Sequence, residues 1–253
     1  MLNGWPYDSS RIPANFKGDL AIGVPLWPKN SSVGVNSAAQ WRQFGEKVKA
    51  KSPNAYIRIG WEMNLPGSYW KVTKANQAQW QTRFIEVSKT LKSVSPGFRI
   101  VYNPNWGPDQ TDADSRAVFN AVKEHVDVYG IDMYDEWPPD TSAANWEKRL
   151  NGTRALQDSL NFAKANGKKF ALPEWGIACN TSGCQWQGHA GGDNPRYINH
   201  TLDFLNKNKA HVEFESYFEE PASYIRSALF AIQTNPNSAN AYKAKLDEIA
   251  KAN

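Results

Sequence analysis

Two glutamates, each at the end of a short apolar run, are the side chains best placed to do chemistry. Residues 56–64 read YIRIGWEMN and residues 169–178 read KFALPEWGIA, so Glu62 and Glu174 each stand beside a tryptophan where a predicted buried strand ends. Burial at the mouth of a core raises a carboxyl pKa toward the range of proton donation near neutral pH. A single glutamate of this kind is usually a solvated strand end, whereas two similar strand ends predict a pair of catalytic carboxylates.

The length of chain between the two glutamates predicts the fold that positions them. It is roughly what three intervening βα units require, at about 30 residues per unit in a barrel of about 250 residues. The sequence therefore predicts an α/β fold, a (β/α)8 TIM barrel with both carboxylates on its C-terminal rim. Paired carboxylates on that rim suggest glycoside hydrolysis.

A buried arginine precedes the first glutamate on the same face of its strand. Arg58 lies four residues before Glu62, and a strand has a side-chain period of two. A cation inside a barrel needs an acidic partner, and Asp132, in the predicted strand Val126–Met133, is one candidate.

The sequence resembles glycoside hydrolase family 26 of clan A, whose best-known members are endo-β-mannanases. The resemblance runs from about Tyr56 to about Tyr224, and where the family usually has a histidine before the first glutamate this chain has Trp61. It rests on three elements: Arg58-x-x-x-Glu62-Met63-Asn64, Gly130-x-Asp132-x-Tyr134, and Pro173-Glu174-Trp175-Gly176.

The resemblance implies a retaining endo-glycosidase that needs no metal or organic cofactor. Glu174 is then the nucleophile, Glu62 the acid/base, and Tyr134 a donor that orients Glu174; Tyr217, from the last strand, is the expected floor of the cleavage subsite. The further expected substrate contacts are Arg58, Trp61, Asn64, Trp70, Asn105, Trp106, Asp132, Trp137, Trp175 and Trp186. β-Mannan is the first expected substrate, but Trp61 keeps β-xylan, β-glucan and microbial exopolysaccharides open.

Two rival functions use the same residues. A carbohydrate-binding protein descended from such an enzyme is favoured by Trp61 and by a shortage of predicted strands, but it has no need of both glutamates with Arg58 and Tyr134. A transglycosylase would transfer the sugar to a hydroxyl group instead of water, and the sequence does not distinguish it from a hydrolase.

Length and composition indicate a single domain, 1–253, and with the resemblance we expect it to be a catalytic domain that acts on polysaccharide as a monomer. Hydrophobic residues make up 41% of the 253 residues, which is enough for a large core, and eleven tryptophans exceed what a core needs. The net charge is +4 and the charged residues are spread along the chain, which argues against nucleic acid as a partner. No apolar stretch is long enough to span a membrane. The N-terminus does not look like a signal peptide.

The two cysteines point to the compartment. Cys179 and Cys184 lie five positions apart in the loop after Glu174. A disulfide in an exported protein is favoured over two reduced thiols in a cytosolic one, and with His189 they make too few ligands for a metal site. We therefore expect a secreted protein.

The predicted elements alternate, but the strands are too few. Helices are predicted over Ala38–Ala50, Gln77–Lys92, Ser115–His125, Trp146–Asn166, Tyr197–Asn206 and Ser223–Asn253, the last interrupted near Pro236. Six strands begin near Asp19, Tyr56, Phe98, Val126, Lys169 and Val212. Eighteen residues before the first strand cannot hold two βα units. The barrel is therefore shortened at its N-terminus, or the assigned strand register is wrong.

Overall fold

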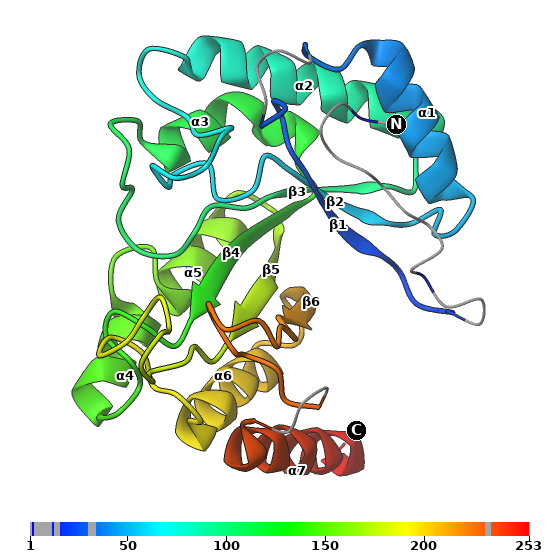
Figure 1. Cartoon of the computed structure of the whole chain (residues 1–253). Helices are drawn as coiled ribbons and strands as arrows, with labels where there is room; N and C mark the ends of the chain where they lie inside the picture. The colour runs from blue at the N-terminus through cyan, green and yellow to red at the C-terminus, as the bar shows by residue number, and fades with distance from the viewer. Residues whose placement is uncertain (1, 3–11, 13–15, 30–33, 231–233, 253) are drawn as a thin grey trace. The chain divides into compact units, whose positions relative to one another are not determined.

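Helices and parallel strands alternate along the chain in the computed structural model (Figure 1). It describes residues 2, 12, 16–29, 34–230 and 234–252. The chain divides into two compact units, unit 1 comprising Met1–Gly130 with Ala165–Lys168 and unit 2 comprising Ile131–Lys164 with Lys169–Asn253. That residues 1–253 act as one catalytic domain stays a prediction.

Unit 1 is built on parallel strands that follow one another in chain order. They are β1 (Ala21–Val24), β2 (Tyr56–Ile59), β3 (Arg99–Tyr102) and the first residues of β4 (Val128–Tyr134). The register pairs Val24 with Ile59, and Tyr102 with Tyr129. All four residues of β2 are buried, as expected of a central parallel strand covered on both faces.

Three helices of unit 1 lie along one side of strands β1–β3 (Figure 1). They are α1 (Ala38–Lys49), α2 (Gln77–Val94) and α3 (Ser115–Val122), the last followed by the 3₁₀ helix η3 (Lys123–His125). A capping box starts α1, because Ser37 and Gln40 each accept a hydrogen bond from the other's backbone N–H. The helices bury the periodic apolar residues that predicted them: Trp41, Phe44, Val48, Trp80, Phe84, Val87 and Leu91.

Unit 2 holds the end of β4 and the parallel pair β5 (Lys169–Gly176) and β6 (Val212–Tyr217). Its helices are α4 (Ala143–Asn151), α5 (Leu156–Ala165), α6 (Pro195–Lys207) and α7 (Pro236–Ala252), and α6 packs against α7 (Figure 1). Strands β5 and β6 pair Phe170 with Val212 and Trp175 with Tyr217, with register shifts between them.

The predicted single helix Trp146–Asn166 is wrong, because two helices occupy that stretch. Gly152 ends α4 in an extended conformation while its N–H donates to the Lys148 carbonyl at 2.9 Å. A Cβ atom on Gly152 would lie 2.3 Å from that carbonyl oxygen, so only glycine fits. The chain restarts with Arg154 at φ 55°, whose N–H donates to Asp158 at 2.7 Å.

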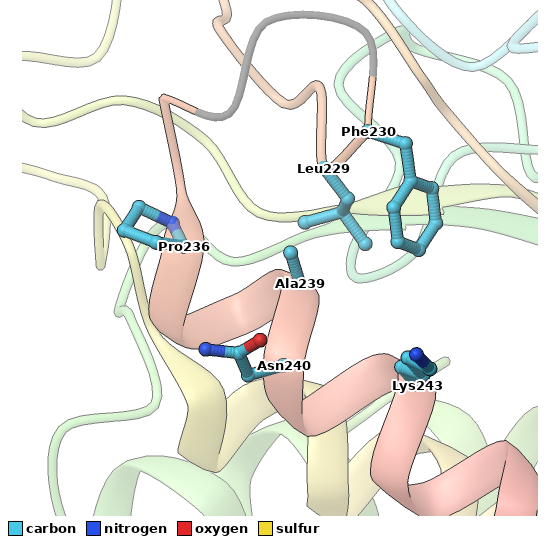
Figure 2. A pocket seen from close by; sticks show the side chains of 6 residues that line it. All are labelled: Leu229, Phe230, Pro236, Ala239, Asn240 and Lys243. Atoms are coloured by element: carbon cyan, nitrogen blue, oxygen red, sulfur yellow. The ribbon is translucent and has the colours of Figure 1, made fainter.

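The predicted helix from Ser223 onward is also wrong over residues 223–230, and the helix α7 begins at Pro236. Side chains make the backbone hydrogen bonds there. Glu219 accepts from the N–H groups of Leu229 and Phe230. Asn235 Nδ2 donates to the carbonyls of Arg226 and Ala228 at 2.8 Å. Figure 2 shows the resulting pocket of about 270 Å³, in which Leu229 and Phe230 face α7. The helix lines it with Pro236, Ala239, Asn240 and Lys243.

All six predicted strands are present, with some of their ends shifted. Strands β1 and β3 are shorter at both ends, β2, β5 and β6 end one or two residues early, and β4 begins at Val128 and extends one residue beyond the predicted Met133. Two earlier barrel strands, if present, would have to lie within residues 1–18, and most of these lie outside the described residues. None of the helices among the described residues combines the length and apolar character that crossing a membrane requires.

Candidate active site

In unit 1, Glu62 stands in a tight turn directly after β2. Gly60 has φ 58° and Glu62 has φ 51°, a backbone region that a glutamate rarely adopts and that often marks functional sites. The Glu62 N–H donates to the Asn103 carbonyl at 2.7 Å, and the Glu62 carboxylate accepts from Asn105 Nδ2 at 3.1 Å. The turn thus fixes both ends of the residue, and Glu62 remains partly exposed.

Asn105 is itself held by Asn64 through two reciprocal hydrogen bonds. Asn64 Oδ1 accepts from the Asn105 N–H at 2.8 Å, and Asn64 Nδ2 donates to the Asn105 carbonyl at 2.9 Å. Asn64 is buried. It therefore positions the amide that contacts Glu62, and the predicted substrate contact of Asn64 stays a prediction.

Arg58 is buried and its Nε donates to Asn103 Oδ1 at 2.5 Å. Its guanidinium carbon also lies 5.9 Å from the centre of the Trp61 ring. Asp132 lies in unit 2 and has no exposed surface. The pairing of Arg58 with Asp132 joins residues of different units and stays a prediction.

Three indoles brace the peptide that precedes Glu62. Trp80 donates to the Trp70 carbonyl at 2.9 Å, Trp70 donates to the Trp61 carbonyl at 2.5 Å, and the Trp61 and Trp70 rings are 4.2 Å apart. A Cβ atom on Gly23 would lie 3.2 Å from the Trp61 ring. Trp70 is buried, which fits support of Trp61 better than direct contact with a substrate.

In unit 2, Glu174 accepts a hydrogen bond from the Tyr134 hydroxyl at 2.5 Å, as the resemblance implies. Tyr134 is in turn packed between Trp186, whose ring stacks at 6.4 Å, and Phe218, whose ring meets it edge-on at 5.6 Å. A hydrogen bond from a fixed donor orients a carboxylate, which is what a nucleophile requires.

Behind Glu174 lies an aromatic cluster around a second carboxyl group. Trp175 is fully buried and donates to Glu215 Oε2 at 2.5 Å, and the Tyr242 hydroxyl donates to Glu215 Oε1 at 3.4 Å. Burial raises the pKa of Glu215, and these two hydrogen bonds oppose that effect only in part. Trp175 thus fits a packing role behind Glu174 rather than a sugar contact.

We expect Glu215→Gln to stabilise the protein increasingly as the pH rises. The folded-state pKa of Glu215 lies above its unfolded value, so wild type loses stability as the pH climbs from the unfolded pKa, about 4.3, through the folded one. The amide never ionises and still accepts from Trp175. Thermal melts between pH 4 and pH 8 should show the variant's advantage growing with pH, while Glu46→Gln, at an exposed position of α1, follows wild type. A constant difference would contradict this.

Tyr217 and Tyr224 flank the same region of unit 2. The Tyr217 hydroxyl donates to the Ser227 carbonyl at 2.8 Å and accepts from the Ile177 N–H at 3.3 Å, so its polar end is used within the unit. Its role as a subsite floor stays a prediction for the ring. Sequence reasoning missed Tyr224, whose side chain is 44% exposed; partial burial raises its pKa, and the charges of Glu220 and Glu174 raise it further.

A buried arginine network supports the end of β4 that carries Tyr134. Arg149 has no exposed surface, donates to the carbonyls of Tyr134, Glu136 and Pro138 at 2.6–2.9 Å, and lies 3.7 Å from Asp135. Burial raises the pKa of the Asp135 carboxyl, and the Arg149 guanidinium is the largest of the influences that lower it. The sequence contained no signal for this network, because Arg149 lies on a helix that reads as polar.

The remaining predicted residues lie in loops. Cys179 and Cys184 form the predicted disulfide. The Trp137 side chain is 59% exposed and its ring stacks on His189 at 3.6 Å, while Trp106 and Trp186 are partly buried. Exposure suits Trp137 to bind a sugar face, and its contact with substrate stays a prediction.

Comparison with solved structures shows that the chain shares the fold of glycoside hydrolases. A modular endo-β-1,4-mannanase of Cellulomonas fimi, a family 26 enzyme, matches with a TM-score of 0.59 at 16% identity, covering 82% of this chain and 45% of the mannanase. A family 128 endo-β-1,3-glucanase of Sorangium cellulosum matches with a TM-score of 0.54 at 17% identity, covering 88% and 79%. A β-xylosidase of Caulobacter crescentus matches with a TM-score of 0.54 at 18% identity, covering 89% and 47%.

These likenesses define the fold class. The structural neighbours are TIM-barrel glycosidases, and the six parallel strands described here correspond to part of a (β/α) barrel. The chain spans slightly less than half the length of the mannanase. No protein-family model matches the sequence, and no curated protein matches it.

Proposed function

We propose that the protein is a retaining endo-acting β-glycosidase with Glu174 as nucleophile and Glu62 as acid/base. The observation that carries the proposal is the hydrogen bond from Tyr134 to Glu174, because a carboxylate held by a fixed phenol is oriented for attack. The fold supports it, since the neighbours are glycoside hydrolases with a partial match to this chain. A binding protein would have no use for an oriented carboxylate at this place.

The proposed chemistry has two steps. Glu174 attacks the anomeric carbon while Glu62 gives its proton to the leaving oxygen, which forms a glycosyl-enzyme and breaks the glycosidic bond. Glu62 then takes a proton from water, which attacks the same carbon and releases the sugar and the Glu174 carboxylate. Retention requires the two carboxyl groups to act about 5–5.5 Å apart.

The proposed substrate is a β-linked polysaccharide. Mannan is the first candidate because of the family 26 resemblance and the mannanase neighbour, and β-1,3-glucan and xylan follow from the other two neighbours. The two catalytic carboxylates need neither metal nor cofactor in this mechanism. The disulfide fits a secreted protein, which is how we propose it acts.

The test is product release from a panel of β-mannan, β-xylan, β-glucans and microbial exopolysaccharides, read by reducing-end assay and chromatography. Turnover of one polymer, with the new reducing end formed in the β configuration by proton NMR at early times, would support the proposal. An α product would exclude the double displacement. Binding without turnover across the panel would favour a non-catalytic carbohydrate-binding protein, and transfer products at high substrate would indicate a transglycosylase.

Tyr134→Phe is expected to lower kcat about tenfold to a hundredfold with a smaller change in KM. The substitution removes only the hydroxyl that donates to Glu174, and a hydrogen bond to a charged group contributes about 1.5–3 kcal/mol. Steady-state kinetics on the polymer found in the panel would measure both constants. The matched control is Tyr129→Phe, on the same strand in unit 1. An unchanged kcat in Tyr134→Phe would contradict the assigned role.

A further inference from the structure

Unit 1 contains a pocket of about 320 Å³ that the glutamates do not line. Its described lining residues come from the segment after β1 and from the loop after β2: Trp27, Pro28, Lys29, Gly34, Val35 and Tyr69. They combine two large aromatic side chains with one ammonium group and include no acid. Such a mixture of apolar walls and a few polar groups is typical of a ligand pocket. Among the described residues that line the pocket of Figure 2, by contrast, none carries an indole or a phenol.

The register of the sheet places this pocket on the edge of unit 1 that carries Glu62. Strands β1 and β2 are parallel and pair Val24 with Ile59. Trp27 follows Val24 by the same number of residues as Glu62 follows Ile59. Both residues therefore leave their strands at the same carboxyl edge, where ligands of open parallel sheets bind.

Packing also links the pocket to the Glu62 turn. Tyr69 precedes Trp70, whose ring lies 4.2 Å from the Trp61 ring, and whose N–H holds the Trp61 carbonyl next to Glu62. A sugar in the pocket would thus lie beside the residues that pack on the Glu62 turn.

The side chains of the pocket select the kind of sugar. Tyr69 is 57% exposed, and Lys29 Nζ lies 4.9 Å from the centre of its ring. Aromatic faces bind the apolar faces of pyranoses, and an ammonium held in the wall by an aromatic ring attracts a carboxylate. Lys29 is exposed, so water hydrates its charge when a neutral sugar is bound, whereas a carboxylate on the sugar would gain an ion pair with it.

We propose that the pocket of Trp27, Lys29 and Tyr69 binds a sugar that carries a carboxylate, such as a uronic acid, in the polysaccharide substrate. The inference rests on the proposed function and narrows it, because it predicts that the preferred substrate is an acidic polysaccharide or an acid-substituted one. The carboxylate pairs with Lys29 while the pyranose ring packs on the aromatic wall.

The test compares polymers that differ only in their carboxylates. β-Mannan and β-glucan are each used unmodified and after oxidation at C6, and glucuronoxylan is used before and after reduction of its carboxyl groups. Affinity electrophoresis with each polymer measures binding without depending on turnover. Of each pair of polymers, one carries carboxylates and the other is neutral. Lys29→Met is expected to weaken binding to the polymer with carboxylates about fivefold and to leave binding to its neutral counterpart unchanged.

Two further variants separate a site from general charge attraction. Lys51→Met removes the same charge at an exposed position just before β2, at the opposite edge of the sheet, and should bind like wild type. Tyr69→Ala should weaken binding to the acidic polymer and to the neutral polymer about threefold to tenfold each, because it removes the surface on which a sugar ring stacks. Equal losses in Lys29→Met and Lys51→Met, or no preference of wild type for the acidic member, would overturn the proposal.

The outcomes also separate this proposal from the proposed function. Binding that depends on Lys29 without release of product from any polymer would sustain the pocket and refute the hydrolase. The opposite result is turnover of a polymer whose binding and rate of hydrolysis depend neither on Lys29 nor on carboxylates in the polymer. That result would support the hydrolase and refute the proposed pocket.

Discussion

Glu174→Gln is expected to lower kcat about a thousandfold on every substrate, whereas Glu62→Gln should slow the first step, formation of the glycosyl-enzyme, only when the leaving group is poor. A nucleophile is needed whatever the leaving group, but a nitrophenolate departs without a proton from Glu62. On nitrophenyl glycosides, Glu62→Gln should therefore release a rapid burst of phenol and then slow, because water still lacks its base in the second step. Stopped-flow absorbance measures the burst, and azide should accelerate the slow step.

The control for this pair is Glu86→Gln, an exposed glutamate on α2 that should leave both rates unchanged. Equal losses in the rate of glycosyl-enzyme formation on polymer and on nitrophenyl glycoside in Glu62→Gln would contradict its assignment as acid/base. Azide should rescue both alanine variants but give opposite products: an α-glycosyl azide from Glu174→Ala, where azide replaces the nucleophile, and a β-glycosyl azide from Glu62→Ala, where azide replaces the water of the second step.

The sequence predicted the elements of the fold wherever one physical signal was enough. Periodic tryptophan and phenylalanine residues located α1 and α2, and apolar runs located all six strands. The two wrong helices arose where a glycine interrupts the backbone or where backbone N–H groups donate hydrogen bonds to a side chain distant in the sequence. Gly152 splits a helix whose apolar spacing continues through it, and Glu219 holds the N–H groups of Leu229 and Phe230 out of any helix.

The candidate site was predictable at its reactive groups but not at their supports. Glu62 and Glu174 stand at strand ends that a linear pattern reveals, and Tyr134 came from the family resemblance. The partners that orient them depend on packing that the sequence does not display: Glu215 accepts from Trp175 across neighbouring strands, and Arg149 reaches three carbonyls from a polar helix. The left-handed conformation of Glu62 was equally hidden, because a glutamate rarely adopts a positive φ.

Arg149→Met is expected to destabilise the protein by about 3–5 kcal/mol, the largest stability effect we foresee. Methionine fills part of the space but leaves the carbonyls of Tyr134, Glu136 and Pro138 without their donor, and it leaves the Asp135 carboxylate buried beside no cation. Urea denaturation followed by circular dichroism would measure the free energy of unfolding. Lys148→Met, an exposed position on the same helix α4, is the matched control and should cost less than about 0.5 kcal/mol.

The pH dependence of this loss identifies its cause. Burial already raises the pKa of Asp135, and without the Arg149 guanidinium that pKa rises further, so the folded variant holds a proton that the unfolded chain releases. The loss should therefore be largest near neutral pH and shrink as the pH falls toward the unfolded carboxyl pKa of about 3.9, where Asp135 is protonated in both states. A loss that stays constant with pH would assign the effect to the missing hydrogen bonds alone. A loss below about 1 kcal/mol would mean that Arg149 does not hold the end of β4 in place.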